Sequence, residues 1–326
     1  MTDFGVTIPP ASPQPLLPGT IPPDTVVMSA RPSSLWRDTL ANVLRQRSAL
    51  VGLTILAVLV LMAVFASQIA THDPNQTLLG VEAGVQRREA PCIHLLGCPA
   101  DQPQHLFGTD GNFRDVFSRV VFGARTSLSI GLAAVLLAIV VGSTIGAIAG
   151  FVGGWVDNVL MRLMDVILAF PSLLLAIAIV TAIGTSLVNA LYAIFIVSIP
   201  IYARVVRASV LSGREHDYVT ASRALGESGF GLLARRIMPN ALTPLVVQGT
   251  LGIGGAVLEI AALAFVGVTG DLTQPEWGSM IGFERNQLFT APHIILAPGI
   301  AITLAVLGFN LLGDGLRDAL DPRLNR

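Results

Sequence analysis

Residues 217–240, DYVTASRALGESGFGLLARRIMPN, form a polar interruption in a chain that is otherwise dominated by apolar residues. From 218 to 225, small and apolar residues recur at spacings of three and four, which predicts a short amphipathic helix. Gly226 is expected to end this helix, and a second short helix is predicted over 231–238. Pro239 suits the first turn of a further helix. These features make residues 217–240 the best candidate for a docking surface in the chain.

The composition places the chain among integral membrane proteins. Its mean hydropathy is +0.69, 52% of its residues are hydrophobic and only 13% are charged. All 20 basic residues are arginine, so the chain has no lysine for the phosphate-binding loop of an ordinary P-loop ATPase. Any ATP-driven role would therefore need a separate ATPase subunit.

Uncharged stretches long enough to cross ~30 Å of hydrocarbon predict an all-α protein with six membrane-spanning helices. The spans are expected at about 49–70, 127–151, 160–183, 187–206, 242–266 and 291–312. Four glycines of the second span recur at helical spacings and predict close approach to neighbouring helices: Gly131, Gly142, Gly146 and Gly150. Three prolines interrupt helical stretches and are expected to mark kinks: Pro171, Pro200 and Pro298.

The distribution of arginine predicts the orientation of these spans. Arginines precede the first span, flank residues 217–240 and close the chain, whereas those of the first long loop are offset by acidic residues. This bias is expected to place both termini and residues 217–240 in the cytoplasm. The predicted units are a disordered cytoplasmic tail (1–35), a first transmembrane helix (36–72), an extracytoplasmic loop (73–125), a five-helix core (126–316) with a cytoplasmic loop (212–240), and a cytoplasmic tail (317–326).

The two cysteines, Cys92 and Cys98, lie in the stretch CIHLLGC of the loop that is predicted to face outward. Thiols meet an oxidising compartment there, so an intrachain disulfide is the first interpretation. Metal binding with His94 and His105 is the alternative, but the spacing fits no established ligand signature. We therefore assign no metal ligand and no cofactor from the sequence. No zinc-protease motif, nucleophile elbow or pair of catalytic carboxylates occurs either, which argues against an intramembrane hydrolase.

Glu259 is the only charged residue inside the fifth predicted span. Burying a charge in a membrane costs at least ~2.5 kcal/mol, so such a residue marks either a functional site or a paired structural contact. The preferred interpretation is structural, with the carboxylate bonded to a neighbouring helix. Contact with a translocation path is the alternative.

The spacing within 217–240 resembles the "EAA" coupling loop of binding-protein-dependent ABC importer permeases. Thr220, Ala221 and Ser222 stand at its opening triplet, Gly226 at its glycine and Pro239 at its closing proline. Thr220 and Ser222 depart from the Glu and Ala that are commoner in the family, but small residues at 221 and 222 still allow close packing into a partner's groove. The resemblance implies an ATPase-coupling role for Asp217, Tyr218, Thr220, Ala221, Ser222, Arg223, Gly226 and Pro239.

Residues 105–131, HLFGTDGNFRDVFSRVVFGARTSLSIG, resemble a signature of the C-type permease subunit of dipeptide and oligopeptide importers, which belong to the peptide/nickel family. Residues 153–176, 275–280 and 308–323 are similar to other parts of the same subunits, so the resemblance covers about 35–323. Within the signature, 113–121 has one apolar and one polar helical face, which predicts a helix lying in the membrane interface. A plain helix-entry segment and a direct role in receiving a binding protein are the two interpretations of what this stretch does.

This resemblance implies the type I ABC importer permease fold in a bacterial inner membrane. It also implies a homologous B-type permease, two ATPase subunits and an extracytoplasmic substrate-binding protein as partners, with lipid around the bundle and no nucleic acid. The chain itself would not be an enzyme. The implied cargo is di- or oligopeptide, with nickel, glutathione or another small solute as alternatives. A secondary transporter or channel is the rival from another class, but the inverted repeats or multiple intramembrane charges that such a protein would show are absent from the sequence.

Overall fold

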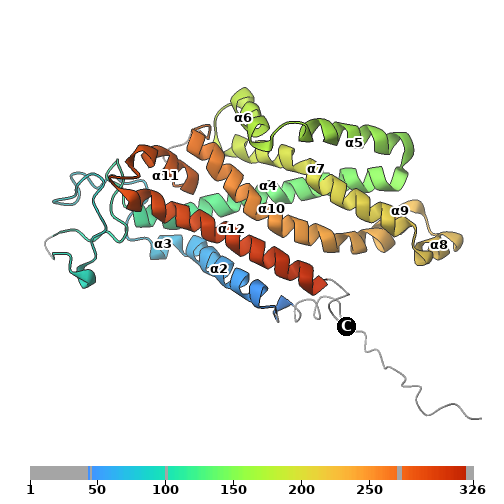
Figure 1. The fold of residues 1–326 in the computed structure, drawn as a ribbon, viewed down its shortest axis with the longest axis horizontal. Coiled ribbons are helices and arrows are strands. Elements are labelled where there is room, and N and C mark those ends of the chain that lie inside the picture. Colours follow the sequence, from blue (N-terminus) through green and yellow to red (C-terminus); the bar gives the residue numbers. More distant parts are fainter. Residues whose placement is uncertain (1–42, 45, 100–101, 270–273, 321–326) are drawn as a thin grey trace, which may run out of the picture.

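The computed structural model describes residues 43–44, 46–99, 102–269 and 274–320, and within them the fold is helical (Figure 1). The predicted tail at 1–35 lies outside the described residues, as do 321–326 of the predicted C-terminal tail. The main helices are α2 (Arg47–Val64), α3 (Ala66–Ile69), α4 (Val116–Val152), α5 (Gly154–Leu168), α6 (Ser172–Ile183), α7 (Leu187–Arg214), α8 (Asp217–Ala224), α9 (Gly229–Gly231), α10 (Met238–Val266), α11 (Trp277–Glu284) and α12 (Pro292–Leu320).

Five helices in this part of the chain are long and apolar enough to cross a membrane: α2, α4, α7, the helical run Gly229–Val266 that ends in α10, and α12. The pair α5 and α6 makes a sixth span if the two are counted together, although they meet at 90°. The sequence predicted one span here with a kink at Pro171. The helix instead breaks, because proline lacks the backbone N–H and disfavours helical geometry in the residue before it. By contrast, α7 and α12 continue through Pro200 and Pro298.

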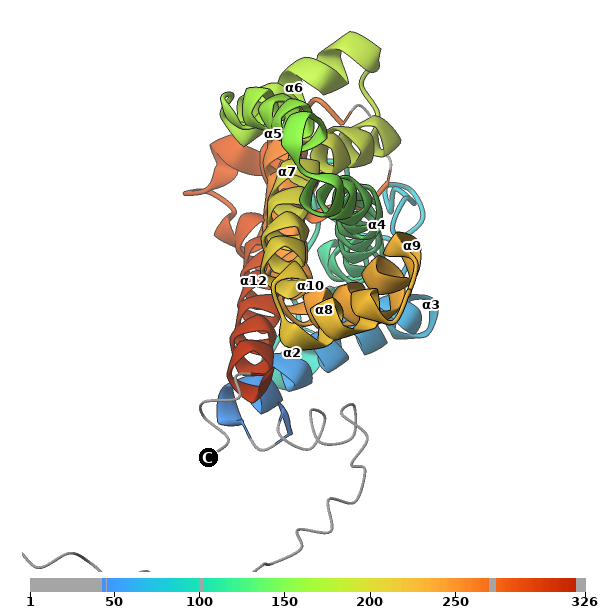
Figure 2. The same ribbon diagram turned by 90° about the vertical axis from the view of Figure 1, so that its right-hand side faces the viewer.

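The long helices run along one common axis, and the two ends of the bundle carry different structures (Figures 1 and 2). The stretch 70–115, of which residues 70–99 and 102–115 are described and which contains the short 3-10 helix His94–Leu96, lies at one end, beside α11. The helices α8 and α9 lie at the opposite end, and both the start of α2 and the end of α12 lie toward that end (Figure 1). In the same view α5 and α6 return the chain to the end where α7 begins, so the chain passes along the bundle six times.

The contact between α4 and α7 is the most extensive in the bundle, and glycines of α4 permit it. A Cβ added to Gly142 would lie 2.7 Å from the carbonyl oxygen of Ile199, and one on Gly150 would lie 3.0 Å from that of Arg207. Gly146, between them, lies directly against the carbonyl of Ala203. The predicted close approach at these glycines is therefore confirmed, since the backbone of α7 occupies the space of the missing side chains.

Gly146→Ala should lower the thermal stability of the isolated chain, because its new methyl group would push α7 away. Overpacking of this kind costs roughly 1–3 kcal/mol. Gly255→Ala in α10 is the matched control, since a Cβ there meets no atom within 4 Å. In a helix that exchange is neutral or stabilising by up to about 1 kcal/mol. Thermal unfolding in detergent measures both, and equal melting temperatures for the two variants would show that the glycine contact is unimportant.

The start of α4 corrects the prediction of an interfacial helix at 113–121. A single helix begins at Val116, and the Asp115 carboxylate caps it by accepting a hydrogen bond of 2.7 Å from the backbone N–H of Ser118. Both predicted faces are inside the protein: Val116, Val120 and Val121 are buried, and so are Asp115, Ser118 and Arg119. The polar face contacts protein rather than headgroups, as Arg119 donates to the Pro74 carbonyl at 2.8 Å.

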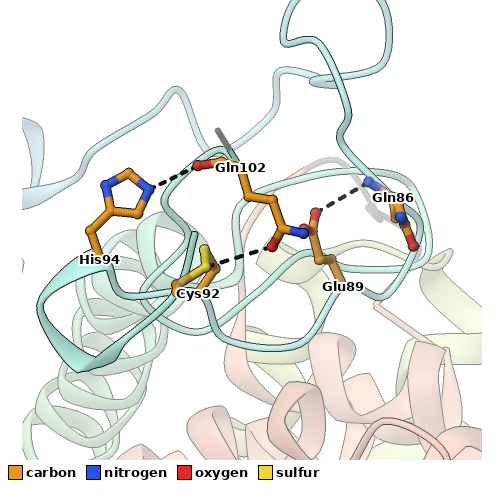
Figure 3. Close-up of a disulfide and its surroundings, with 6 residues drawn as sticks. Gln86, Glu89, Cys92, His94 and Gln102 are labelled. Carbon is orange, nitrogen blue, oxygen red and sulfur yellow. Dashed lines mark hydrogen bonds between the residues drawn. A yellow bond between two sulfur atoms is a disulfide. The ribbon is translucent and has the colours of Figure 1, made fainter. Parts of the chain in front are cut away.

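The stretch before α4 is fixed by its own cross-links (Figure 3). Cys92 and Cys98 are joined as a disulfide with their Cα atoms 5.4 Å apart. The Cys92 N–H donates to the His105 carbonyl at 2.9 Å, and an imidazole nitrogen of His94 lies 2.8 Å from the Gln102 carbonyl oxygen. At the bundle, the Glu284 carboxylate at the end of α11 accepts from the Gly111 N–H at 2.7 Å and pairs with Arg88 at 2.8 Å.

Candidate coupling loop

The helix α8 ends in a hydrogen-bonded glycine motif. Gly226 has a φ of 85°, and its N–H donates to the Arg223 carbonyl at 3.0 Å while the Glu227 N–H donates to that of Ser222 at 3.1 Å. This pair of bonds is the Schellman motif, in which the left-handed residue is usually glycine. The predicted helix end at Gly226 is confirmed. A Cβ at this position would meet no atom within 4 Å, so backbone conformation rather than space favours glycine.

One side of α8 packs against the segment that leads into α10 and is hydrogen-bonded to it. Val219 is completely buried. The Asn240 amide donates to the Tyr218 hydroxyl at 2.8 Å, and Arg236 pairs with Glu227 at 3.1 Å. These contacts hold α8 against the first turn of α10, so displacement of α8 would displace that turn.

The other side of the loop is open and carries apolar side chains. Thr220, Ala221 and Arg223 are exposed, and they are followed by Leu225 and Phe230, which are 89% and 81% exposed. Two large apolar side chains exposed in one short polar segment favour this segment as a surface that another protein covers.

The segment after Gly226 differs in form from the predicted separate helix at 231–238. The helix α9 runs into a π-helical turn at Leu232–Ile237, which continues directly into α10. Leu232 and Ile237 are buried, whereas Arg235 and Arg236 are exposed. Pro239 lies in the first turn of α10, and it has no N–H to donate to the preceding π-helical turn. Because no break separates this segment from α10, the loop and the long helix form one continuous element.

Two further contacts join the loop to the ends of α4 and α7. Arg214, at the end of α7, donates to the Gly150 carbonyl of α4 at 2.8 Å and lies over the Phe151 ring. Gly213 lies against Ile237, where a Cβ would come within 2.9 Å of that side chain. The long helices α4, α7 and α10 are thus connected at the end of the bundle that bears α8.

The structure brings together the residues that the sequence singled out. Six of them, from Asp217 to Arg223, lie on α8, Gly226 ends that helix and Pro239 begins α10. Sequence reasoning missed the exposed Leu225 and Phe230, as well as Arg214. The signal that could have revealed the first two is the presence of large apolar residues on both sides of a helix-ending glycine in a polar segment.

Glu259 lies in α10, away from this loop. Its carboxylate is half-buried and close to the Ser172 hydroxyl at the start of α6, with the Tyr202 side chain of α7 nearby. The residue therefore lies where α10 meets α6 and α7.

Comparison with known proteins identifies the class. Residues 142–326 match the family "Binding-protein-dependent transport system inner membrane component", and residues 34–91 match "N-terminal TM domain of oligopeptide transport permease C". The chain belongs to the first family, and it is a membrane permease of the type I ABC importer fold.

The relatives come from several bacteria. The chain is 42% identical to the dipeptide transport system permease protein DppC of Alkalihalophilus pseudofirmus, over 94% of this chain and 95% of the relative. It is 46% identical to the dipeptide permease DppC of Escherichia coli K12, over 86% and 91%. It is also 40% identical to the glutathione transport system permease protein GsiD of Shigella flexneri, over 89% and 91%.

Proposed function

We propose that this chain is one of the two permease subunits of an ATP-driven importer and that it carries di- and oligopeptides into the cell. The observation that carries the proposal is the open apolar surface of α8 and α9, which is continuous with α10 and connected to α4 and α7. The names of the relatives support peptide as the cargo.

In the proposed mechanism, an ATPase subunit covers the exposed side of α8, and a B-type permease with its own ATPase completes the assembly. Closure of the ATPases on ATP pushes α8. The contacts of Tyr218 with Asn240 and of Arg214 with Gly150 then carry the displacement into α10 and α4. The two bundles rock between inward-open and outward-open arrangements as rigid bodies. A binding protein delivers the peptide at the opposite end, beside the stretch 70–115.

This mechanism requires α8 and both termini in the cytoplasm, with the disulfide-bearing stretch outside. The arginine bias supports that orientation. The position of α8, the start of α2 and the end of α12 toward one end of the bundle supports it as well (Figure 1).

Uptake measurements test the cargo. A strain lacking the chain, complemented with wild type, should accumulate labelled dipeptides and oligopeptides in competition with unlabelled peptide. Glutathione and nickel are the comparison substrates, since one relative is named for glutathione. Restored uptake of glutathione or nickel without peptide would contradict the peptide assignment while leaving the importer class intact.

We also propose that Glu259 has a structural role, because it lies between three helices beside a hydroxyl group. Glu259→Gln keeps the shape and most hydrogen bonds of the side chain but removes its charge. The variant should assemble with the other subunits and transport peptide at close to the wild-type rate. If the variant assembles fully but uptake is abolished, Glu259 contacts the translocation path.

A further inference from the structure

Three side chains from separate segments converge beside the start of α4. His72 follows α3, Glu82 lies in the next turn, and His105 comes from beyond the disulfide. One ligand atom from each lies within 4.8 Å of the other two. The Nε2 atom of His72 is 2.9 Å from one Glu82 oxygen, and the Nε2 atom of His105 is 3.3 Å from the other.

The second nitrogen of each imidazole already has a partner. The Nδ1 atom of His105 lies 3.3 Å from a carboxylate oxygen of Asp115, and both of these side chains are fully buried. The Nδ1 atom of His72 lies 2.9 Å from the Thr71 hydroxyl, which donates to the other Asp115 oxygen at 3.2 Å. Donation from Nδ1 would leave the Nε2 lone pair of each ring available to a metal ion near Glu82. Metal-binding histidines are characteristically oriented in this way by a carboxylate or other acceptor on the second nitrogen.

Two buried atoms at the centre of this cluster have no hydrogen-bond partner: the Nε2 of His105 and an oxygen of Glu82. They lie 3.3 Å apart but are not aligned as donor and acceptor. A buried polar atom without a partner costs on the order of 1–3 kcal/mol, and two on facing groups require an explanation. A cation between them would satisfy both.

We propose that His72, Glu82 and His105 bind a divalent transition-metal ion of the Zn²⁺ class. Two imidazole nitrogens and one carboxylate oxygen form a donor set that suits zinc and not Mg²⁺ or Ca²⁺, which prefer oxygen ligands. Zinc bonds of about 2.0–2.1 Å in tetrahedral geometry place neighbouring ligands roughly 3.3–3.4 Å apart. The three ligand atoms of this cluster lie within 4.8 Å of one another, so small side-chain movements would bring them to that spacing. The side chains of His72 and Glu82 are 20% and 27% exposed, which leaves a side open for water as the fourth ligand.

The bound ion would fasten the stretch 70–115 to the bundle. His72 is held to α4 by its backbone N–H, which donates to the Ser118 hydroxyl at 3.0 Å. The turn before Glu82 is held by Leu78, whose N–H donates to the Phe113 carbonyl at 2.9 Å. The backbone carbonyl of His105 accepts a hydrogen bond of 2.9 Å from the backbone N–H of Cys92. One ion would therefore cross-link three loop segments at the start of the longest helix, independently of the cargo.

Metal titration of the purified full-length chain tests the proposal. After removal of metal with a chelator, ZnCl₂ is added in competition with a chromophoric chelator, and CoCl₂ is added separately for its visible absorption. We expect one equivalent of Zn²⁺ per chain, a tetrahedral Co²⁺ spectrum, a higher melting temperature with Zn²⁺, and no such effects with Mg²⁺ or Ca²⁺. His72→Gln and Glu82→Gln should each lose at least tenfold in Zn²⁺ affinity.

Two further variants make the test specific. His94→Gln is the matched control, since this histidine lies in the same stretch but contacts Gln102, and it should bind Zn²⁺ like wild type. Thr71→Val removes the hydroxyl that contacts the His72 ring and also donates to Asp115, and it should weaken binding about tenfold, as loss of such outer contacts does. A cooperative thermal unfolding transition of the metal-free protein, at a temperature close to that of metal-free wild type, shows that each variant is folded. Binding that is absent from wild type, or unchanged in His72→Gln and Glu82→Gln, would overturn the proposal.

Discussion

Ala221→Glu should leave a stable, membrane-inserted permease that no longer couples to ATP hydrolysis. Ala221 lies on the open side of α8, whereas the residue that anchors the helix, Val219, is fully buried. A carboxylate placed in a desolvated protein contact costs roughly 2 kcal/mol or more. That cost corresponds to about a thirtyfold loss of affinity for the ATPase subunit.

The measurement for Ala221→Glu is ATP hydrolysis by the complete complex, with and without binding protein loaded with peptide. We expect loss of the stimulated rate, while co-purification with the B-type permease continues. Ala221→Ser is the control, because it keeps the residue small and should behave as wild type. Full stimulated hydrolysis by Ala221→Glu would mean that this side of α8 is not the contact.

Glu276→Ala should markedly lower the stability of the bundle, because it removes a buried carboxylate that joins α11 to α4. Glu276 is buried and precedes α11 in an extended conformation. Its carboxylate accepts from the N–H groups of Gly278 at 2.9 Å and Ser279 at 2.7 Å, and from the Ser127 hydroxyl of α4 at 3.1 Å. Burial raises the pKa of Glu276, and these hydrogen bonds oppose the rise.

The neighbouring tryptophan depends on the same contact. Trp277 is fully buried, its backbone N–H donates to the Ser127 hydroxyl at 3.3 Å, and its indole N–H donates to the Val120 carbonyl at 2.9 Å. Removal of a helix cap costs typically about 1 kcal/mol, and buried donors left without partners cost roughly 1–3 kcal/mol. We therefore expect Glu276→Ala to lower stability by about 2–4 kcal/mol.

Thermal unfolding in detergent measures this effect. Glu227→Ala is the control, since it removes a carboxylate whose pairing with Arg236 is at the surface and worth only ~0–1 kcal/mol. Similar melting temperatures for the two variants would contradict a structural role for the buried cap.

Much of the bundle could be predicted because each membrane helix has a pattern within its own short stretch of sequence. Runs of uncharged residues predicted the membrane spans. The spacing of glycines in α4 predicted a close contact with a neighbouring helix, which is α7. The break at Pro171 was harder to predict, because proline is compatible with both a kink and a complete break. After the break, α6 packs against α7 and α10. Such contacts between distant segments cannot be read from the local sequence.

The error at 113–121 has a similar cause. A helix with one apolar and one polar side suits a membrane interface, but it equally suits a helix whose polar side is bonded to a distant loop. The bond from Arg119 to Pro74 spans 45 positions in the chain, and nothing in the local pattern reveals it.

The candidate coupling loop was predictable in position because it combines a helical period, a helix-ending glycine and a proline within 24 residues. The cluster of His72, Glu82 and His105 was not predictable from spacing. Sequence reasoning paired His105 with His94 and the cysteines, whereas folding brings His105 to Glu82 and His72. Such a set is assembled by loop closure and has no fixed interval along the chain.

The central claim, that an ATPase subunit covers the open side of α8, is tested most directly by thiol labelling of Leu225→Cys in the presence and absence of that subunit. The two native cysteines are joined in the disulfide, so the introduced thiol is the one available for reaction. Leu95→Cys is the matched control, because Leu225 and Leu95 are 89% and 94% exposed. We predict that the ATPase subunit slows labelling at 225 at least tenfold and leaves position 95 unchanged. Equal labelling rates at 225 with and without the subunit would contradict the account.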